Sequence, residues 1–96
     1  MTITRKQTDS TLVIALEGYL DTRTAPILHE ELEKGLDGIN ELFWDFSKLE
    51  YMTSAGFREL LRAQDMLGDS GRMKVIHARE EVQKAFYLTG MDDLLG

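Results

Sequence analysis

Two adjacent hydroxyl side chains, Thr53 and Ser54, stand where a strand-like segment gives way to a helix-like one. The small residues Ala55 and Gly56 follow them and leave the first helical turn uncluttered. The first N–H groups of a helix have no partner inside it and lie at the positive end of its dipole. We expect a hydroxyl here to be exposed, and a phosphate on it would meet those donors. Helix capping by Thr53 or Ser54 is the simpler interpretation of the same pattern.

Other chemistry finds little support in the residue types. The chain has no cysteines, which excludes disulfides, cysteine zinc sites and thiol catalysis. His29 and Glu33 have the i,i+4 spacing of a metal pair, but two ligands make a poor site, so we expect neither metal nor cofactor. The residues before Ser54 lack the first glycine of a hydrolase nucleophile elbow, and His77, the other histidine, is not expected to act as a base. Since no glycine-rich phosphate-binding motif is present either, we expect a protein that is not an enzyme.

Length and charge narrow the class of partner. The 96 residues, 43% of them hydrophobic, suit one domain spanning residues 1–96. The net charge of −6 disfavours direct binding to nucleic acid or to anionic membranes, and Arg58 with Arg62 is the densest basic pair. No apolar run approaches the ~20 residues that span a bilayer, and the first residues are polar, so we expect a cytoplasmic protein. Its partners should be proteins or small ligands.

The apolar periodicity predicts the element order β-β-α-β-α-β-α. The expected strands are 3–8, 11–17, 41–46 and 72–78, with strand 41–46 buried on both faces. The expected helices run from Thr22 or Thr24 to Asp37, from the hydroxyl pair to Gly68, and from Glu80 to Gly90, and residues 47–52 form a short connection. This order predicts an α/β fold with a mixed sheet of four or five strands and helices mainly on one face. Ligands of such sheets meet the carboxyl ends of the strands, here residues 18–24, 47–56 and 78–80.

The segment DFSKLEYMTSAGF, residues 45–57, resembles the signature of STAS domains, in particular of bacterial anti-sigma factor antagonists. Residues 18–21 (GYLD) and 85–92 (AFYLTGMD) are similar to two further family elements, so the resemblance covers essentially the whole chain. It implies that the unphosphorylated protein binds an anti-sigma factor that is also a serine kinase, and so frees the sigma factor. It also implies that phosphorylation of the serine matching Ser54 breaks this complex and that a serine phosphatase restores it. Weak nucleotide binding stays open.

The resemblance makes Ser54 the expected phosphorylation site. Because Asp21 is predicted to lie on the neighbouring strand-end loop, we expect it either to repel the phosphate or to orient the serine hydroxyl. The expected partner contacts are Asp21, Thr22, Tyr51, Met52, Thr53, Ala55, Gly56, Arg58 and Arg62. Many phosphorylated members have Asp before the serine, whereas this chain has Thr53, a second possible phosphate acceptor. This departure keeps an alternative open, in which the chain is a non-phosphorylated STAS scaffold of a stress-signalling assembly or a ligand-binding STAS subunit of a lipid transport system.

Overall fold

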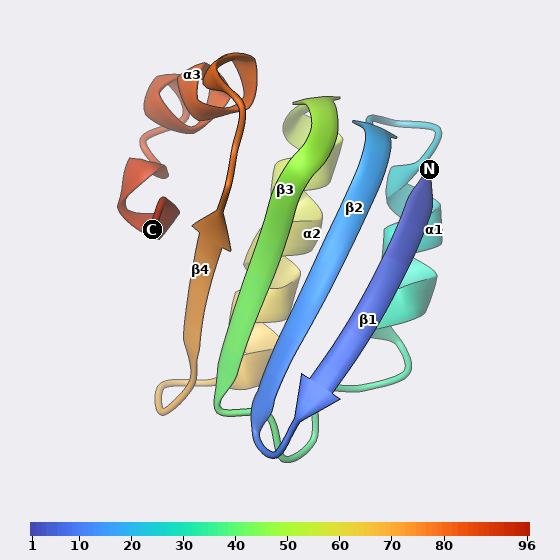
Figure 1. The fold of residues 1–96 in the computed structure, drawn as a ribbon, viewed down its shortest axis with the longest axis vertical. Coiled ribbons are helices and arrows are strands. Elements are labelled where there is room, and N and C mark those ends of the chain that lie inside the picture. Colours follow the sequence, from blue (N-terminus) through green and yellow to red (C-terminus); the bar gives the residue numbers. More distant parts are fainter.

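A four-stranded mixed sheet forms the centre of the molecule in the computed structural model, which describes residues 1–96 (Figure 1). The elements are β1 (Thr2–Thr8), β2 (Thr11–Leu20), α1 (Ala25–Leu32), β3 (Glu41–Met52), α2 (Ser54–Leu67), β4 (Arg72–Ile76), α3 (Glu80–Leu88) and a short 3₁₀ helix (Asp92–Leu94). The strand order is β1-β2-β3-β4, with β1 antiparallel to β2 and the other neighbours parallel. The expected α/β class, element order and mixed sheet are therefore confirmed.

One face of the sheet carries the hydrophobic core and the other is open. Alternate side chains of β3, among them Leu42, Trp44 and Phe46, are completely buried, whereas Phe43, between Leu42 and Trp44, is only partly buried. The expectation that this strand is buried on both faces is therefore wrong. All three helices contribute to this one core. Leu28 and Leu32 of α1 belong to it, and Phe86 of α3 lies 4.8 Å from Phe57 of α2 and 6.4 Å from Phe46, measured between ring centroids.

Strand β3 continues through the segment that the sequence indicated to be a short connection. Its pairing with β2 contains two register shifts, each of which places an extra residue in β3. Buried side chains therefore occur at Phe46, Leu49 and Met52, a spacing of three that matches neither an ordinary strand nor a helix. Strand β2 likewise runs past Gly18 to Leu20, so the carboxyl ends of the two strands lie side by side.

Two other elements end earlier than their sequence pattern indicated. Helix α1 ends at Leu32, although Leu36 continues the four-residue apolar spacing. Leu36 lies in the loop after the helix, and its side chain is buried in the core. Strand β4 ends at Ile76, because His77 adopts a left-handed conformation with φ of 60°. None of the helices has the length and apolar character needed to cross a membrane.

The absence of a side chain at Gly56 allows α2 to approach β2 closely. A Cβ atom at this position would lie 2.7 Å from Cγ and 2.8 Å from Cδ2 of Leu20, and Leu20 is completely buried. The glycine therefore fixes the distance between the first turn of α2 and the end of β2.

We predict that Gly56→Ala lowers the free energy of unfolding by about 1–3 kcal/mol, because the methyl group overpacks the contact with Leu20. Urea denaturation followed by circular dichroism measures the change. The control is Ser54→Ala, at an exposed position of the same helical turn, which should change stability by no more than about 0.5 kcal/mol. Equal stability of Gly56→Ala and the wild type would contradict the close packing.

Candidate phosphorylation and partner-binding site

The turn after β2 and the start of α2 meet at one edge of the sheet. The backbone N–H of Thr53 donates a hydrogen bond to the carbonyl of Leu20 at 2.9 Å, and α2 begins at the next residue. Figure 1 shows this edge at the upper ends of β2 and β3. The loops that the sequence placed at the carboxyl ends of these strands are thus brought together.

The two neighbouring hydroxyls have different environments. Ser54 is the first residue of α2; it is exposed, and its side chain makes no hydrogen bond. Thr53 is the N-cap residue, yet its hydroxyl makes no capping hydrogen bond, and Oγ1 is buried without a partner. Neither side chain therefore caps the helix as the simpler interpretation expects. Of the two, the Ser54 hydroxyl is the one accessible to a phosphate donor.

Asp21 holds the neighbouring turn in shape. Its Oδ1 accepts hydrogen bonds from the backbone N–H groups of Arg23 at 2.9 Å and Thr24 at 3.1 Å, and it lies 3.3 Å from the Thr24 hydroxyl. Burial by itself would raise the pKa of Asp21, but the hydrogen bonds from Thr24 and Arg23 outweigh it and hold the pKa below its ordinary value. The carboxylate is therefore ionised at neutral pH. No hydrogen bond joins it to Ser54, so the orienting role has no contact to support it.

An exposed aromatic pair lies beside Asp21. The rings of Tyr19 and Tyr51, on the adjacent ends of β2 and β3, have centroids 4.8 Å apart. The exposed fraction is 45% for Tyr19 and 43% for Tyr51. The Tyr51 hydroxyl lies 3.5 Å from Oδ2 of Asp21. Sequence reasoning selected Tyr51 but missed Tyr19, although the GYLD segment that contains it had been singled out.

The first turns of α1 and α2 border a groove of about 330 Å³ next to Ser54. Its lining residues are Thr22, Ala25, Pro26, His29, Ala55, Arg58 and Glu59. His29 contacts Glu59 at 3.0 Å and Glu33 at 3.1 Å, and Arg62 contacts Glu33 at 2.8 Å. The i,i+4 pair of His29 and Glu33 thus belongs to a network of polar contacts between the helices, and no group of three metal-ligating side chains is present.

The residues expected to contact a partner differ in their exposure to solvent. Thr22, Tyr51 and Arg58 are exposed around Ser54, and Ala55 is partly exposed. The expectation that Met52 offers contact surface is corrected, because its side chain points into the core and is only 6% exposed. Gly56 is also buried; it affects the site through its close packing against Leu20 and not as contact surface.

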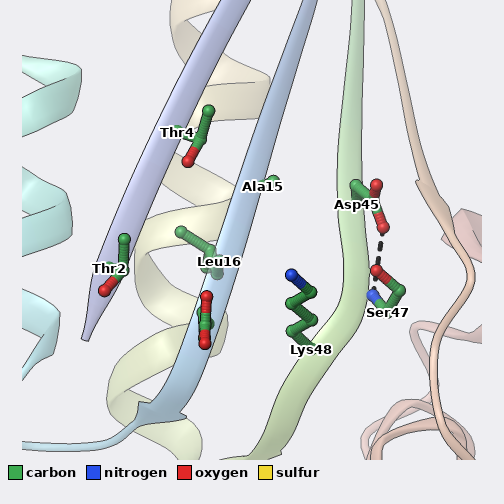
Figure 2. Close-up of a pocket in the computed structure, with 8 residues that line it drawn as sticks. Thr2, Thr4, Ala15, Leu16, Asp45, Ser47 and Lys48 are labelled. Carbon is green, nitrogen blue, oxygen red and sulfur yellow. Dashed lines mark hydrogen bonds between the residues drawn. The ribbon is translucent and has the colours of Figure 1, made fainter.

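A second polar cluster lies on the open face of the sheet, around a hollow of about 190 Å³ (Figure 2). Oδ1 of Asp45 accepts a hydrogen bond from the N–H of Ser47 at 3.0 Å and lies 3.3 Å from Nδ1 of His77. Burial would raise the pKa of Asp45, but the hydrogen bonds from Ser47 and His77 outweigh it and lower the pKa. Ser47 and His77 share the carboxylate without bonding to each other, so no nucleophile–base pair is formed.

Comparisons with known proteins agree with this geometry. A family model described as "Mlab, STAS domain" matches residues 3–96, so the chain belongs to the STAS domain family. It is 28% identical over 92 residues to BtrV of Bordetella bronchiseptica, which is named an anti-sigma factor antagonist; the match covers 94% of this chain and 79% of BtrV. The chain is therefore a STAS domain, and the relative that it resembles along most of its length is named an anti-sigma factor antagonist.

Solved structures of such antagonists superpose over nearly the whole chain. The unphosphorylated form of the antagonist SpoIIAA has a TM-score of 0.87 at 22% identity, covering 99% of this chain and 86% of SpoIIAA. Its phosphorylated form, from Bacillus, gives 0.77 at 21% identity, covering 99% and 89%. An antagonist from Mycobacterium paratuberculosis gives 0.84 at 26% identity, covering 98% and 81%.

The lowered pKa of Asp21 predicts a pH-dependent contribution to stability. A carboxyl whose pKa is lower in the folded state stabilises the fold above its unfolded value, here 3.8, and loses that contribution as the pH falls through the folded pKa. We therefore expect Asp21→Asn to be less stable than the wild type at pH 7, and the difference to shrink below pH 4. Urea denaturation across this range measures it. A difference that stays constant with pH would contradict the ionised role of Asp21.

Proposed function

We propose that this chain is an anti-sigma factor antagonist of the bacterial cytoplasm that works by phosphorylation-controlled partner switching. Unphosphorylated, it binds an anti-sigma factor that is also a serine kinase and so releases the sigma factor. Phosphorylation of Ser54 breaks the complex, and a serine phosphatase restores it. The observation that carries this proposal is the exposed Ser54 hydroxyl, which has no partner inside the fold and stands at the edge where β2 and β3 end.

A phosphate at this position would change binding with little change in fold. It adds about −1.5 to −2 charge at neutral pH. Transfer of that charge into an interface where the partner protein supplies no cation costs several kcal/mol, and about 2.8 kcal/mol weakens binding ~100-fold. The ionised carboxylate of Asp21 on the neighbouring turn adds repulsion against the phosphate. Because the Ser54 side chain makes no hydrogen bond within the fold, its modification breaks none.

The partner surface that we propose extends from the aromatic pair across Ser54 to the first turns of α2. Tyr19 and Tyr51 supply exposed aromatic area, the residue type most enriched among binding hot spots. Thr22, Ala55 and Arg58 continue the surface along the groove between α1 and α2. Arg62 is already engaged with Glu33 at 2.8 Å and contributes less.

Phosphate mapping tests the proposed acceptor. We predict that incubation with the cognate kinase and ATP places one phosphate on Ser54 and that Ser54→Ala accepts none. Thr53→Val is the matched control: it removes a buried hydroxyl that has no partner, so it should fold and still be phosphorylated. Mass spectrometry of proteolytic fragments gives the site. Phosphate on Thr53 of the wild-type protein would contradict the assignment.

Alanine substitution tests the aromatic part of the surface. We predict that Tyr51→Ala weakens binding of the unphosphorylated protein to its kinase partner by about 1–2 kcal/mol, roughly tenfold, because a large desolvated contact is lost. Tyr87→Ala is the control, since Tyr87 is 61% exposed on α3 and lies outside this surface. Titration calorimetry measures both affinities. Equal losses for the two variants would argue against a contact centred on Tyr51.

The second candidate is a STAS module that is not phosphorylated, either a scaffold of a stress-signalling assembly or a subunit of a lipid transport system. The observation that favours it is Thr53, which stands where many phosphorylated members have Asp. The phosphate-mapping experiment separates the two candidates. Binding to a partner that persists while neither hydroxyl accepts phosphate from any serine kinase of the same genome would favour this second function.

A further inference from the structure

Arg58 lies one helical turn beyond Ser54 on the exposed side of α2. Side chains four residues apart on a helix are neighbours, so the two can reach each other across one turn. Arg58 also lines the groove beside Ser54, together with Thr22 and Ala55. Its guanidinium takes part in none of the six ion pairs of the structure.

The acidic residues around Arg58 are engaged elsewhere. Glu59 contacts His29 at 3.0 Å, and Glu33 contacts Arg62 at 2.8 Å. The four positions that a helix places beside Arg58 hold no acidic residue: Ser54, Ala55, Leu61 and Arg62. A phosphate on Ser54 would therefore be the one anion among these helical neighbours of Arg58.

We propose that Arg58 binds the phosphate of phosphorylated Ser54 within the same molecule, an inference that rests on the proposed function. Guanidinium and phosphate form strong charge-assisted hydrogen bonds, and an i,i+4 spacing brings them together on a helix. In the unphosphorylated protein Arg58 is free to contact an acidic group of the partner. Phosphorylation then alters the surface twice, because it adds a dianion and withdraws a cation. The pairing also shields the phosphate, so it slows its removal by a phosphatase.

A thermal coupling experiment tests the pairing without a kinase. Phosphoserine is introduced at position 54 during translation, in the wild-type chain and in Arg58→Gln. We expect the shift in Tm caused by the phosphate to be about 1–4 °C more favourable in the wild-type background than in Arg58→Gln, which is the effect of one i,i+4 ion pair in a domain of this size. Arg62→Gln is the matched control: it removes a cation of the same helix, and the effect of the phosphate should stay as in the wild type.

Phosphorus NMR gives an independent readout on the same samples. We expect the second pKa of the phosphate to lie lower in the wild type than in Arg58→Gln, because a nearby cation favours the dianion. We also expect a serine phosphatase to remove the phosphate faster from Arg58→Gln. An identical effect of the phosphate on Tm and an identical phosphate pKa with and without Arg58 would overturn the inference.

Partner binding separates this inference from the proposed function. If the phosphorylated protein loses its partner while the coupling to Arg58 is zero, the switch stands and the role of Arg58 falls. If the phosphorylated protein binds the partner as tightly as the unphosphorylated one, the switch falls, and the Tm and NMR data still decide whether Arg58 binds the phosphate.

Discussion

The joint ending of β2 and β3 is the constraint on which the site depends. The hydrogen bond from the Thr53 N–H to the Leu20 carbonyl locks the end of β3 to the end of β2. The close approach of Gly56 to Leu20 then sets the first turn of α2 on the same edge. Between the pairs Ala15–Asp45 and Leu20–Met52, β3 contains two more residues than β2. The two register shifts accommodate these extra residues, so that the last residues of the two strands still pair with each other. Ser54 and the Asp21 turn are neighbours as a result.

The polar side chains near the site fall into two groups, those that are paired within the fold and those that are not. Across the interface of α1 and α2, the carboxylates of Glu33 and Glu59 are engaged with His29 and Arg62. At the sheet edge, the Ser54 hydroxyl makes no hydrogen bond and Arg58 makes no ion pair. The engaged groups link α1 to α2, whereas Ser54 and Arg58 are exposed and have no side-chain partner within the fold.

The sequence predicted the element order and the hydroxyl pair, because both depend on local pattern and on a continuous signature. It could not predict the end of β3, since the buried Phe46, Leu49 and Met52 are spaced by bulges that only the pairing with β2 creates. The apolar pattern also predicted that α1 continues to Asp37, because Leu36 keeps the four-residue spacing; in the structure Leu36 lies in the loop after α1, with its side chain buried in the core.

Tertiary contacts decided the rest of the site. The choice between the two hydroxyls depends on the backbone at the N-cap, which buries Oγ1 of Thr53 and exposes Ser54. The ring that packs against Tyr19, that of Tyr51, lies far along the chain and is brought there by the strand register.

The most direct measurement is the affinity of the kinase partner for this protein with serine and with phosphoserine at position 54, by titration calorimetry. We predict a loss of about 100-fold or more on phosphorylation; equal affinities would contradict the switch.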